Sequence, residues 1–286
     1  MLDIPLYSGK RKNILVISGG GMKFFAGLGA ISKLIELEII IKPDIFCGTS
    51  CGAILAFLLN INYSIDEIFY FYYHLNFETL LIDNIDNIFN DVCFGFFLPD
   101  KGIYTVKFLM NKKNINSNIN FKQLFDLTGS KLIITGTCVS DESIHYFSVD
   151  TTPDMKVLTA LQISISIPFI FTPCKYDNKI WVDGGCINNY PIELFHDKLD
   201  DVIGIYLDDN RDIKQIIDSL DSYIFKIFKC IAKGLDYNKI KLYNKNTILI
   251  KSIENISTKW NISKDEKKEL FNIGILCVKD FYSKLQ

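Results

Sequence analysis

Residues 45–59 have the sequence Ile45-Phe46-Cys47-Gly48-Thr49-Ser50-Cys51-Gly52-Ala53-Ile54-Leu55-Ala56-Phe57-Leu58-Leu59. This pattern predicts a buried strand, a sharp corner and an apolar helix, with Ser50 at the corner between Gly48 and Gly52. Glycines two positions before and after the serine let the two backbones pass close together. The corner directs the serine hydroxyl out of the fold and toward the positive end of the helix, which favours negative charge developing there.

The five residues from Gly48 to Gly52 form a weak motif when taken alone, because glycine and serine are common. Their position between an apolar run and an apolar helix gives the motif more weight. Two interpretations follow from the residues: a nucleophilic serine, or a Gly-Ser turn that only joins two core elements.

A second glycine-rich segment follows an apolar run at 13–18 that predicts a buried parallel strand, and it has the sequence Gly19-Gly20-Gly21-Met22-Lys23. Three glycines let backbone amides converge on one point, and the helix predicted to start near Phe24 adds more donors. A dinucleotide loop would need a different glycine spacing, and a phosphate loop would need Gly-Lys-Ser/Thr. An oxyanion hole needs only two amides directed at a carbonyl oxygen, and Lys23 could strengthen it or hold a substrate phosphate.

The length allows one large α/β domain or two small ones, and the composition is sufficient for a sizeable core. Of the 286 residues, 49% are hydrophobic and 13% aromatic, and 31 Lys and Arg nearly balance 33 Asp and Glu. This balance argues against a nucleic-acid partner. The eight cysteines contain no C-x-x-C pair, which favours free thiols in a reducing compartment over a metal site. With no secretory leader and no apolar run of about 18 residues, we expect an intracellular, cytoplasmic protein without a transmembrane segment.

Two features are predicted after the corner serine. Ser64 and Glu67 have the spacing of a capping box that opens a helix through about residue 73. Residues 76–104 lack periodicity and are rich in aromatic side chains. These aromatics either fill a small core of their own or form a lid that presents apolar surface to lipid.

The second half of the chain supplies one further candidate. A helix is predicted at 157–168, and a hairpin with its turn at Asp177-Asn178 runs into Asp183-Gly184-Gly185. An Asp-Gly-Gly turn is ordinary hairpin chemistry, so the residues alone assign it no function. A buried strand at 202–207 precedes a region of apolar stripes at helical spacing.

A nucleophilic serine needs a base, which is most often histidine. The chain has only three histidines, His74, His145 and His196. None of them follows a strand end in the loop position that an α/β-hydrolase uses. The sequence therefore favours a serine whose base is a carboxylate, and a histidine-based hydrolase with His196 fits the chain order poorly.

Three motifs, in this order, resemble the patatin-like phospholipases, whose catalytic core the cytosolic calcium-regulated phospholipases share. They are Ser18-Gly19-Gly20-Gly21-Met22-Lys23, Gly48-Thr49-Ser50-Cys51-Gly52 and Asp183-Gly184-Gly185. The similarity covers residues 12–208. It implies an α/β fold with a mostly parallel central sheet flanked by helices. We expect residues 209–286 to form a helical C-terminal extension packed on the same domain.

The resemblance also implies roles for individual residues. Ser50 would be the nucleophile, and Asp183 the base that takes its proton and later activates water. The amides of Gly20, Gly21 and Cys51 would hold the oxyanion, and Lys23 would lie near the lipid phosphate. Gly19, Gly48, Gly52, Gly184 and Gly185 would be motif glycines, and neither a metal nor a cofactor is needed for this step.

The implied reaction is phospholipase A-type hydrolysis of acyl esters by a protein attached peripherally to a membrane. Hydrolysis of neutral glycerides or other acyl esters by the same dyad is one alternative. A catalytically silent lipid-binding module is another, and the intact Ser50, Asp183 and glycines count against it. Phe24 stands where many members have glycine, and Gly185 replaces a frequent alanine. The head group and any activating protein partner stay open.

Overall fold

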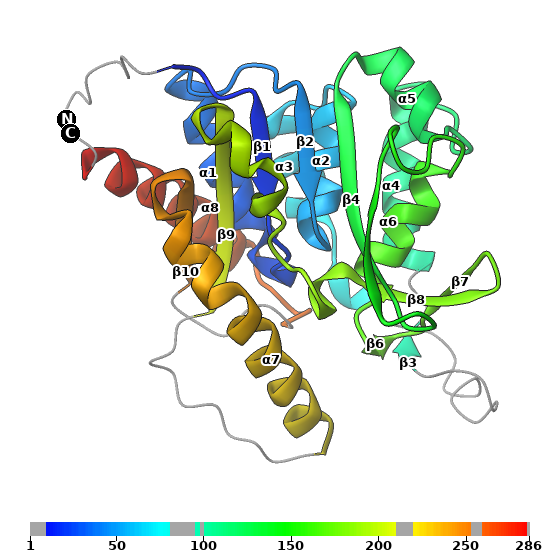
Figure 1. The fold of residues 1–286 in the computed structure, drawn as a ribbon. Coiled ribbons are helices and arrows are strands. Elements are labelled where there is room, and N and C mark those ends of the chain that lie inside the picture. Colours follow the sequence, from blue (N-terminus) through cyan, green and yellow to red (C-terminus); the bar gives the residue numbers. More distant parts are fainter. Residues whose placement is uncertain (1–9, 81–94, 98–99, 210–219, 253–258, 285–286) are drawn as a thin grey trace.

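The computed structural model describes residues 10–80, 95–97, 100–209, 220–252 and 259–284. At its centre lies a sheet with the strand order β10-β9-β1-β2-β4-β8-β7, and β5 pairs with β4 (Figure 1). Five neighbouring strands are parallel: β10 (Thr247–Ser252), β9 (Val202–Asp209), β1 (Ile14–Ile17), β2 (Ile45–Gly48) and β4 (Lys131–Cys138). Three are antiparallel to their neighbours: β5 (Ser143–Phe147), β7 (Cys174–Tyr176) and β8 (Lys179–Asp183). A separate parallel pair joins β3 (Gly95–Phe97) to β6 (Phe169–Phe171).

Helices cover both faces of the sheet (Figure 1). The α-helices are α1 (Phe24–Glu36), α2 (Cys51–Asn60), α3 (Ile65–His74), α4 (Asp100–Lys112), α5 (Phe121–Thr128), α6 (Val157–Ile165), α7 (Leu220–Leu242) and α8 (Lys264–Ser283). Short 3₁₀ segments are η1 (Gly21–Lys23), η2 (Phe77–Leu80), η4 (Gly184–Cys186), η5 (Ile192–Asp201) and η6 (Asn244–Asn246).

Strand β1 shows why both faces need cover, because all four of its residues are buried. Leu15 and Ile17 belong to the larger core cluster, which includes side chains of α1, α2 and α8. Ile14 and Val16 point the other way, into a cluster with side chains of η5. Alternate residues of one strand thus enter two separate cores, as expected for a strand in the middle of an α/β sheet.

Several predicted elements are confirmed. Ser64 and Glu67 form the capping box at the start of α3. The hairpin turn lies between β7 and β8, where Asp177 and Asn178 have φ of 50° and 57°, as a tight two-residue hairpin requires. The helix predicted at 157–168 is α6, and it ends at Ile165.

The region after residue 208 differs from the prediction, because it is not only helical. Residues Thr247–Ser252 form β10, which pairs in parallel with β9 and extends the sheet. Ile248 and Ile250 are fully buried while Lys251 is exposed, so the run has the two-residue alternation of a strand. The helical spacing of the surrounding apolar residues concealed this short element.

The prediction of irregular structure across 76–104 is wrong at its C-terminal end, because α4 begins at Asp100. Gly102 lies within α4 where this helix approaches α6, and a Cβ there would meet Ile165 at 3.2 Å. Residues 81–94 and 98–99 of the expected lid lie outside the described residues. Within the described ranges, no helix is both long enough and apolar enough to cross a bilayer.

Candidate active site

Ser50 occupies the corner between β2 and α2. Its backbone has φ of 55° and ψ of −127°, a strained conformation for a residue with a side chain. Its N–H donates to Ser164 Oγ on α6 at 2.9 Å, which helps to hold the corner. Ser50 is 7% exposed, so its hydroxyl sits in a largely enclosed site.

The two glycines around Ser50 are required by close backbone approach, as the sequence predicts. A Cβ on Gly48 would lie 2.4 Å from the Gly52 carbonyl oxygen. A Cβ on Gly52 would lie 2.5 Å from the carbonyl oxygens of Ile17 and Ser18 at the end of β1. The corner can therefore form only with glycine at both positions.

Asp183 is the last residue of β8 and is 4% exposed. The Ser50 hydroxyl lies beside this carboxylate and acts to lower its pKa, and the Gly185 N–H donates to Asp183 Oδ1 at 2.7 Å. Burial raises the pKa of Asp183 to about 7, although Ser50 and the Gly185 N–H both act to lower it. A carboxyl with this pKa exchanges its proton near neutral pH, which suits a general base.

Strand β4 brings the two residues together, because it lies between β2 and β8. Ile134 of β4 pairs with Gly48, and Gly136 pairs with Asp183. The turn after Asp183 packs tightly on the same strand, since a Cβ on Gly184 would lie 2.2 Å from Thr135 Oγ1. Residues 133 positions apart in sequence (183 − 50) thus meet at the end of the sheet.

The glycine-rich loop lies beside this pair. Gly21 has a φ of 56°, a conformation that glycine adopts without strain. The amides of Gly20 and Gly21 donate to the thiol of Cys51. Burial raises the pKa of Cys51 to about 12, against smaller opposing effects of Lys23 and these amides. Two amides therefore converge next to Ser50, and the Cys51 thiol is their present acceptor.

Lys23 points into the protein. It is 3% exposed, and its ammonium donates to the Leu207 carbonyl oxygen of β9 at 2.8 Å. Lys23 does not line the cavity beside Ser50. This placement does not support a direct contact with a lipid phosphate, but it leaves a positive charge close to Cys51.

An apolar cavity of about 100 Å³ opens beside Ser50 and Cys51. Its wall includes Trp260, from the C-terminal region, whose ring meets Phe171 edge-to-face at 5.8 Å. The other lining residues are Gly21, Met22, Phe24, Ile54, Tyr72, Phe77, Gly102, Thr105, Ile165 and Ile167. The composition of this wall suits a hydrocarbon chain, and the cavity starts at the serine.

The three histidines have their hydrogen bonds away from this pair. His74 contacts the Tyr70 carbonyl oxygen, His145 contacts Ser143, and His196 contacts the Tyr243 hydroxyl. The geometry therefore gives Ser50 a carboxylate partner, in keeping with the positions of the histidines in the sequence.

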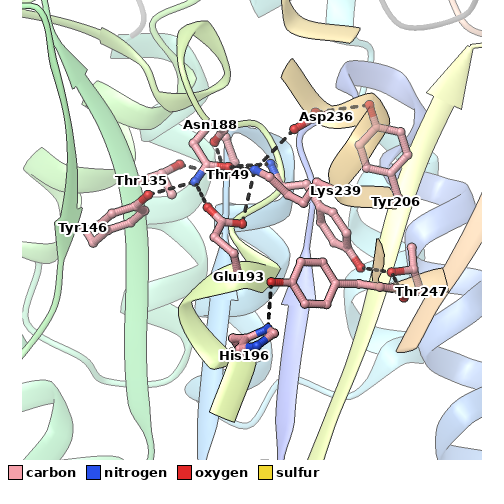
Figure 2. A network of polar contacts seen from close by, with 12 residues as sticks. Thr49, Thr135, Tyr146, Asn188, Glu193, His196, Tyr206, Asp236, Lys239 and Thr247 are labelled. Atoms are coloured by element: carbon pink, nitrogen blue, oxygen red, sulfur yellow. Dashed lines mark hydrogen bonds and ion pairs between the residues drawn. The ribbon is translucent and has the colours of Figure 1, made fainter. Parts of the chain in front are cut away.

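Sequence reasoning missed two asparagines that connect the motifs. The Asn188 carbonyl accepts from Thr49 Oγ1 at 3.4 Å, beside Ser50 (Figure 2). Asn189 exchanges backbone and side-chain hydrogen bonds with Gly19, at 3.3 and 3.4 Å. The signal in the sequence was a polar Asn-Asn pair between a buried strand and Pro191, a few residues after Asp183.

Solved structures show the same fold. The crystal structure of VipD from Legionella pneumophila superposes with a TM-score of 0.69 over 96% of this chain and 67% of its own, at 17% sequence identity. At this identity the likeness concerns the fold alone.

Sequence relatives and a family model identify the family as well as the fold. A probable lipid hydrolase, 463L of Invertebrate iridescent virus 6, is 36% identical over 190 residues, which are 64% of either chain. The uncharacterized protein R571 of Acanthamoeba polyphaga mimivirus is 32% identical over 95% of this chain and 94% of its own. The model of the patatin-like phospholipases matches residues 15–196, a range that contains the serine corner, the glycine loop and Asp183. The chain therefore belongs to the patatin-like phospholipase family.

Proposed function

We propose that this protein is a lipid acyl hydrolase of the phospholipase A type, with Ser50 as nucleophile and Asp183 as base. The main support is the position of Ser50 at a strained corner beside the buried Asp183 carboxylate, in the wall of an apolar cavity. Membership of a family of lipid hydrolases supports the class of reaction.

In the first half-reaction, Asp183 takes the Ser50 proton as Oγ attacks the ester carbon. The electron pair of the carbonyl moves onto its oxygen, and the amides of Gly20, Gly21 and Cys51 donate to that oxyanion. The Cys51 thiol, which now accepts from the two glycine amides, gives way to the substrate oxygen. The bond to the leaving alcohol then breaks, and this alcohol takes the proton from Asp183.

The second half-reaction releases the acyl group. Water attacks the acyl–Ser50 ester while Asp183 takes its proton, and a second oxyanion forms in the same place. Collapse of this intermediate frees the fatty acid, and the proton returns from Asp183 to Ser50 Oγ. The acyl chain lies in the apolar cavity throughout, so the alcohol part of the substrate faces outward. Because such substrates reside in bilayers, we propose that the protein docks peripherally on a membrane.

A second candidate is the hydrolysis of neutral glycerides or other acyl esters. The burial of Lys23 favours it, because this ammonium is held by Leu207 and does not line the cavity. The same dyad and the same acyl cavity would serve both substrates.

The test is fatty-acid release from vesicles that contain phospholipid and triacylglycerol, with a chelator present. Wild-type protein should release fatty acid, and Ser50→Ala and Asp183→Asn should each abolish release while the fold is kept. Asp150→Asn is the matched control, because Asp150 is an exposed carboxylate paired with Lys131. The lipid class that is consumed separates the two candidates.

Two results would contradict the proposal. Near-normal turnover by Ser50→Ala or Asp183→Asn would remove the dyad. No release by the wild type, together with co-sedimentation on the same vesicles, would favour the lipid-binding module instead.

A further inference from the structure

Four polar side chains lie between the sheet and α7, and we call them the Lys239 cluster: Asn188, Glu193, Asp236 and Lys239 (Figure 2). The Lys239 ammonium donates to Asn188 Oδ1 at 2.6 Å. It also lies 3.2 Å from a Glu193 oxygen and 3.5 Å from an Asp236 oxygen. One cation on α7 therefore joins an acid of its own helix to an amide and an acid of the segment between β8 and β9.

The charged groups of this cluster fix the orientation of the Asn188 side chain. The ammonium of Lys239 can only donate, so it faces the amide oxygen. The amide nitrogen faces the opposite way and donates to Glu193 and to the Tyr146 hydroxyl. The Asn188 N–H groups and oxygen are thus all engaged, and the residue is 5% exposed. Asn188 therefore has one preferred position as long as α7 is in place.

The backbone of Asn188 contacts the residues that adjoin both members of the Ser50–Asp183 pair. Its N–H donates to the Gly184 carbonyl at 2.9 Å, directly after Asp183. Its carbonyl accepts from Thr49 Oγ1 at 3.4 Å, directly before Ser50. Thr49 in turn accepts from Thr135 Oγ1 of β4 at 2.8 Å (Figure 2). A displacement of Asn188 would therefore reach the neighbours of both Ser50 and Asp183.

The energetic balance of the cluster also points to a role other than stability. The Asp236 side chain is 1% exposed and that of Lys239 is 15% exposed, so both charges are largely out of water. Desolvation of such a pair offsets most of its attraction, and apolar residues of similar size are often as stabilising. A charged cluster, unlike an apolar one, donates a directed hydrogen bond to Asn188.

We propose that Lys239 is a positioning residue for the Ser50–Asp183 pair, acting from α7 through Asn188; this rests on the proposed function of that pair. Helix α7 lies outside residues 15–196, the range that matches the family model, so a segment beyond the matched core sets the alignment of the dyad. Lys239 does not line the acyl cavity, so it acts on the chemical step and not on substrate binding.

The expected size of the effect follows from geometry. A displacement of about 1 Å in a reacting pair costs about 100-fold in rate. Replacement of Lys239 by methionine, which keeps the length and removes the charge, should therefore lower kcat by about 10- to 100-fold with KM nearly unchanged. The rate at which a fluorophosphonate probe labels Ser50 should fall by a similar factor, because this small probe reports the dyad without lipid binding.

The experiment compares Lys239→Met with Lys241→Met, an exposed lysine on the same helix that should behave as wild type. The substrate is a soluble short-chain ester, and thermal unfolding is followed for each variant. Asn188→Ala is the second variant, because it removes the connection without taking a charge from the cluster. It should lower kcat and the labelling rate as Lys239→Met does, and the double variant should lose no more than the larger single loss.

Independent losses that multiply in the double variant would overturn the inference, since Lys239 would then not act through Asn188. So would variants that unfold at lower temperature while their folded fraction is labelled within about twofold of the wild-type rate. A wild type that neither hydrolyses the ester nor reacts with the probe would overturn the proposed function and this inference together. Full activity that survives Lys239→Met would overturn the inference alone.

Discussion

At the scale of single residues, burial sets the chemistry of Asp183. Its carboxyl can take the Ser50 proton only when ionised, and burial raises its pKa to about 7. We expect kcat/KM for a soluble ester to rise with pH as one proton is lost near pH 7, and to be lost as pH falls through this value. A pH profile from about pH 5 to about pH 9 checks this. A profile that is flat across neutrality would contradict Asp183 as the base.

The same raised pKa has a consequence for stability with the opposite sign. An acid with a folded-state pKa of about 7 and an ordinary value of 3.8 binds more protons folded than unfolded between these values. Its contribution to stability is therefore full below about pH 4 and is lost as pH rises toward 7. The asparagine side chain of the Asp183→Asn variant cannot ionise. The melting temperature of this variant should therefore rise relative to that of the wild type as pH increases across this window. If the two melting temperatures differed by the same amount at every pH, the pKa of Asp183 would not be raised in the folded protein.

Lys23 is a second residue whose role depends on its environment. Its ammonium is buried, is held by Leu207, and favours negative charge at Cys51, where the two glycine amides converge. We expect Lys23→Met to lower kcat by about tenfold, or about 1.4 kcal/mol, on charged phospholipid and on a neutral ester alike. Parallel assays on both substrates check this. A loss of activity on phospholipid alone would instead support a contact between Lys23 and the lipid phosphate, as the family resemblance implies.

At the scale of elements, the sequence predicts what is local and misses what depends on packing between distant segments. Ser50 could be singled out because the glycines of a strand–helix corner are close in sequence. Asp183, at the end of a hairpin strand, is assigned only through the resemblance carried by three motifs in a fixed order. Asn188 and Lys239 could not, because their roles arise only when α7 folds back onto the end of the sheet. The direction of Lys23 likewise depends on β9, which lies far along the chain.

The acyl cavity is also built by distant elements, and Trp260 is its contribution from the C-terminal region. Removal of the indole in Trp260→Ala should lengthen the cavity beside Phe171. We expect the ratio of kcat/KM for long-chain over short-chain esters to rise by about tenfold, since one or two methylenes are worth about 1–3 kcal/mol in such a pocket. Phe125→Ala is the control, because this exposed side chain on α5 does not line the cavity. An unchanged chain-length preference would mean that Trp260 does not limit the acyl site.

At the scale of the whole molecule, the C-terminal region is connected to the core in three ways. Strand β10 continues the sheet beside β9, α7 contacts Asn188 through Lys239, and α8 packs along α1. The contact of α8 with α1 is close because glycines face the partner helix. A Cβ on Gly274 would lie 1.9 Å from the Ala26 carbonyl oxygen.

Gly274→Ala should therefore destabilise the protein, although alanine is the better helix former. The methyl group must push two packed helices apart, which costs about 1–3 kcal/mol, whereas the gain in helix propensity is at most about 1 kcal/mol. Gly234→Ala on α7 is the matched control, since a Cβ there meets nothing within 4 Å and should be neutral or stabilising. Thermal unfolding of both variants measures the difference, which at about 2–4 °C per kcal/mol should be several degrees. Equal melting temperatures would mean that α8 is not packed on α1 in solution. A single cooperative transition, lowered as a whole in Gly274→Ala, would show that the C-terminal region and the catalytic core unfold together.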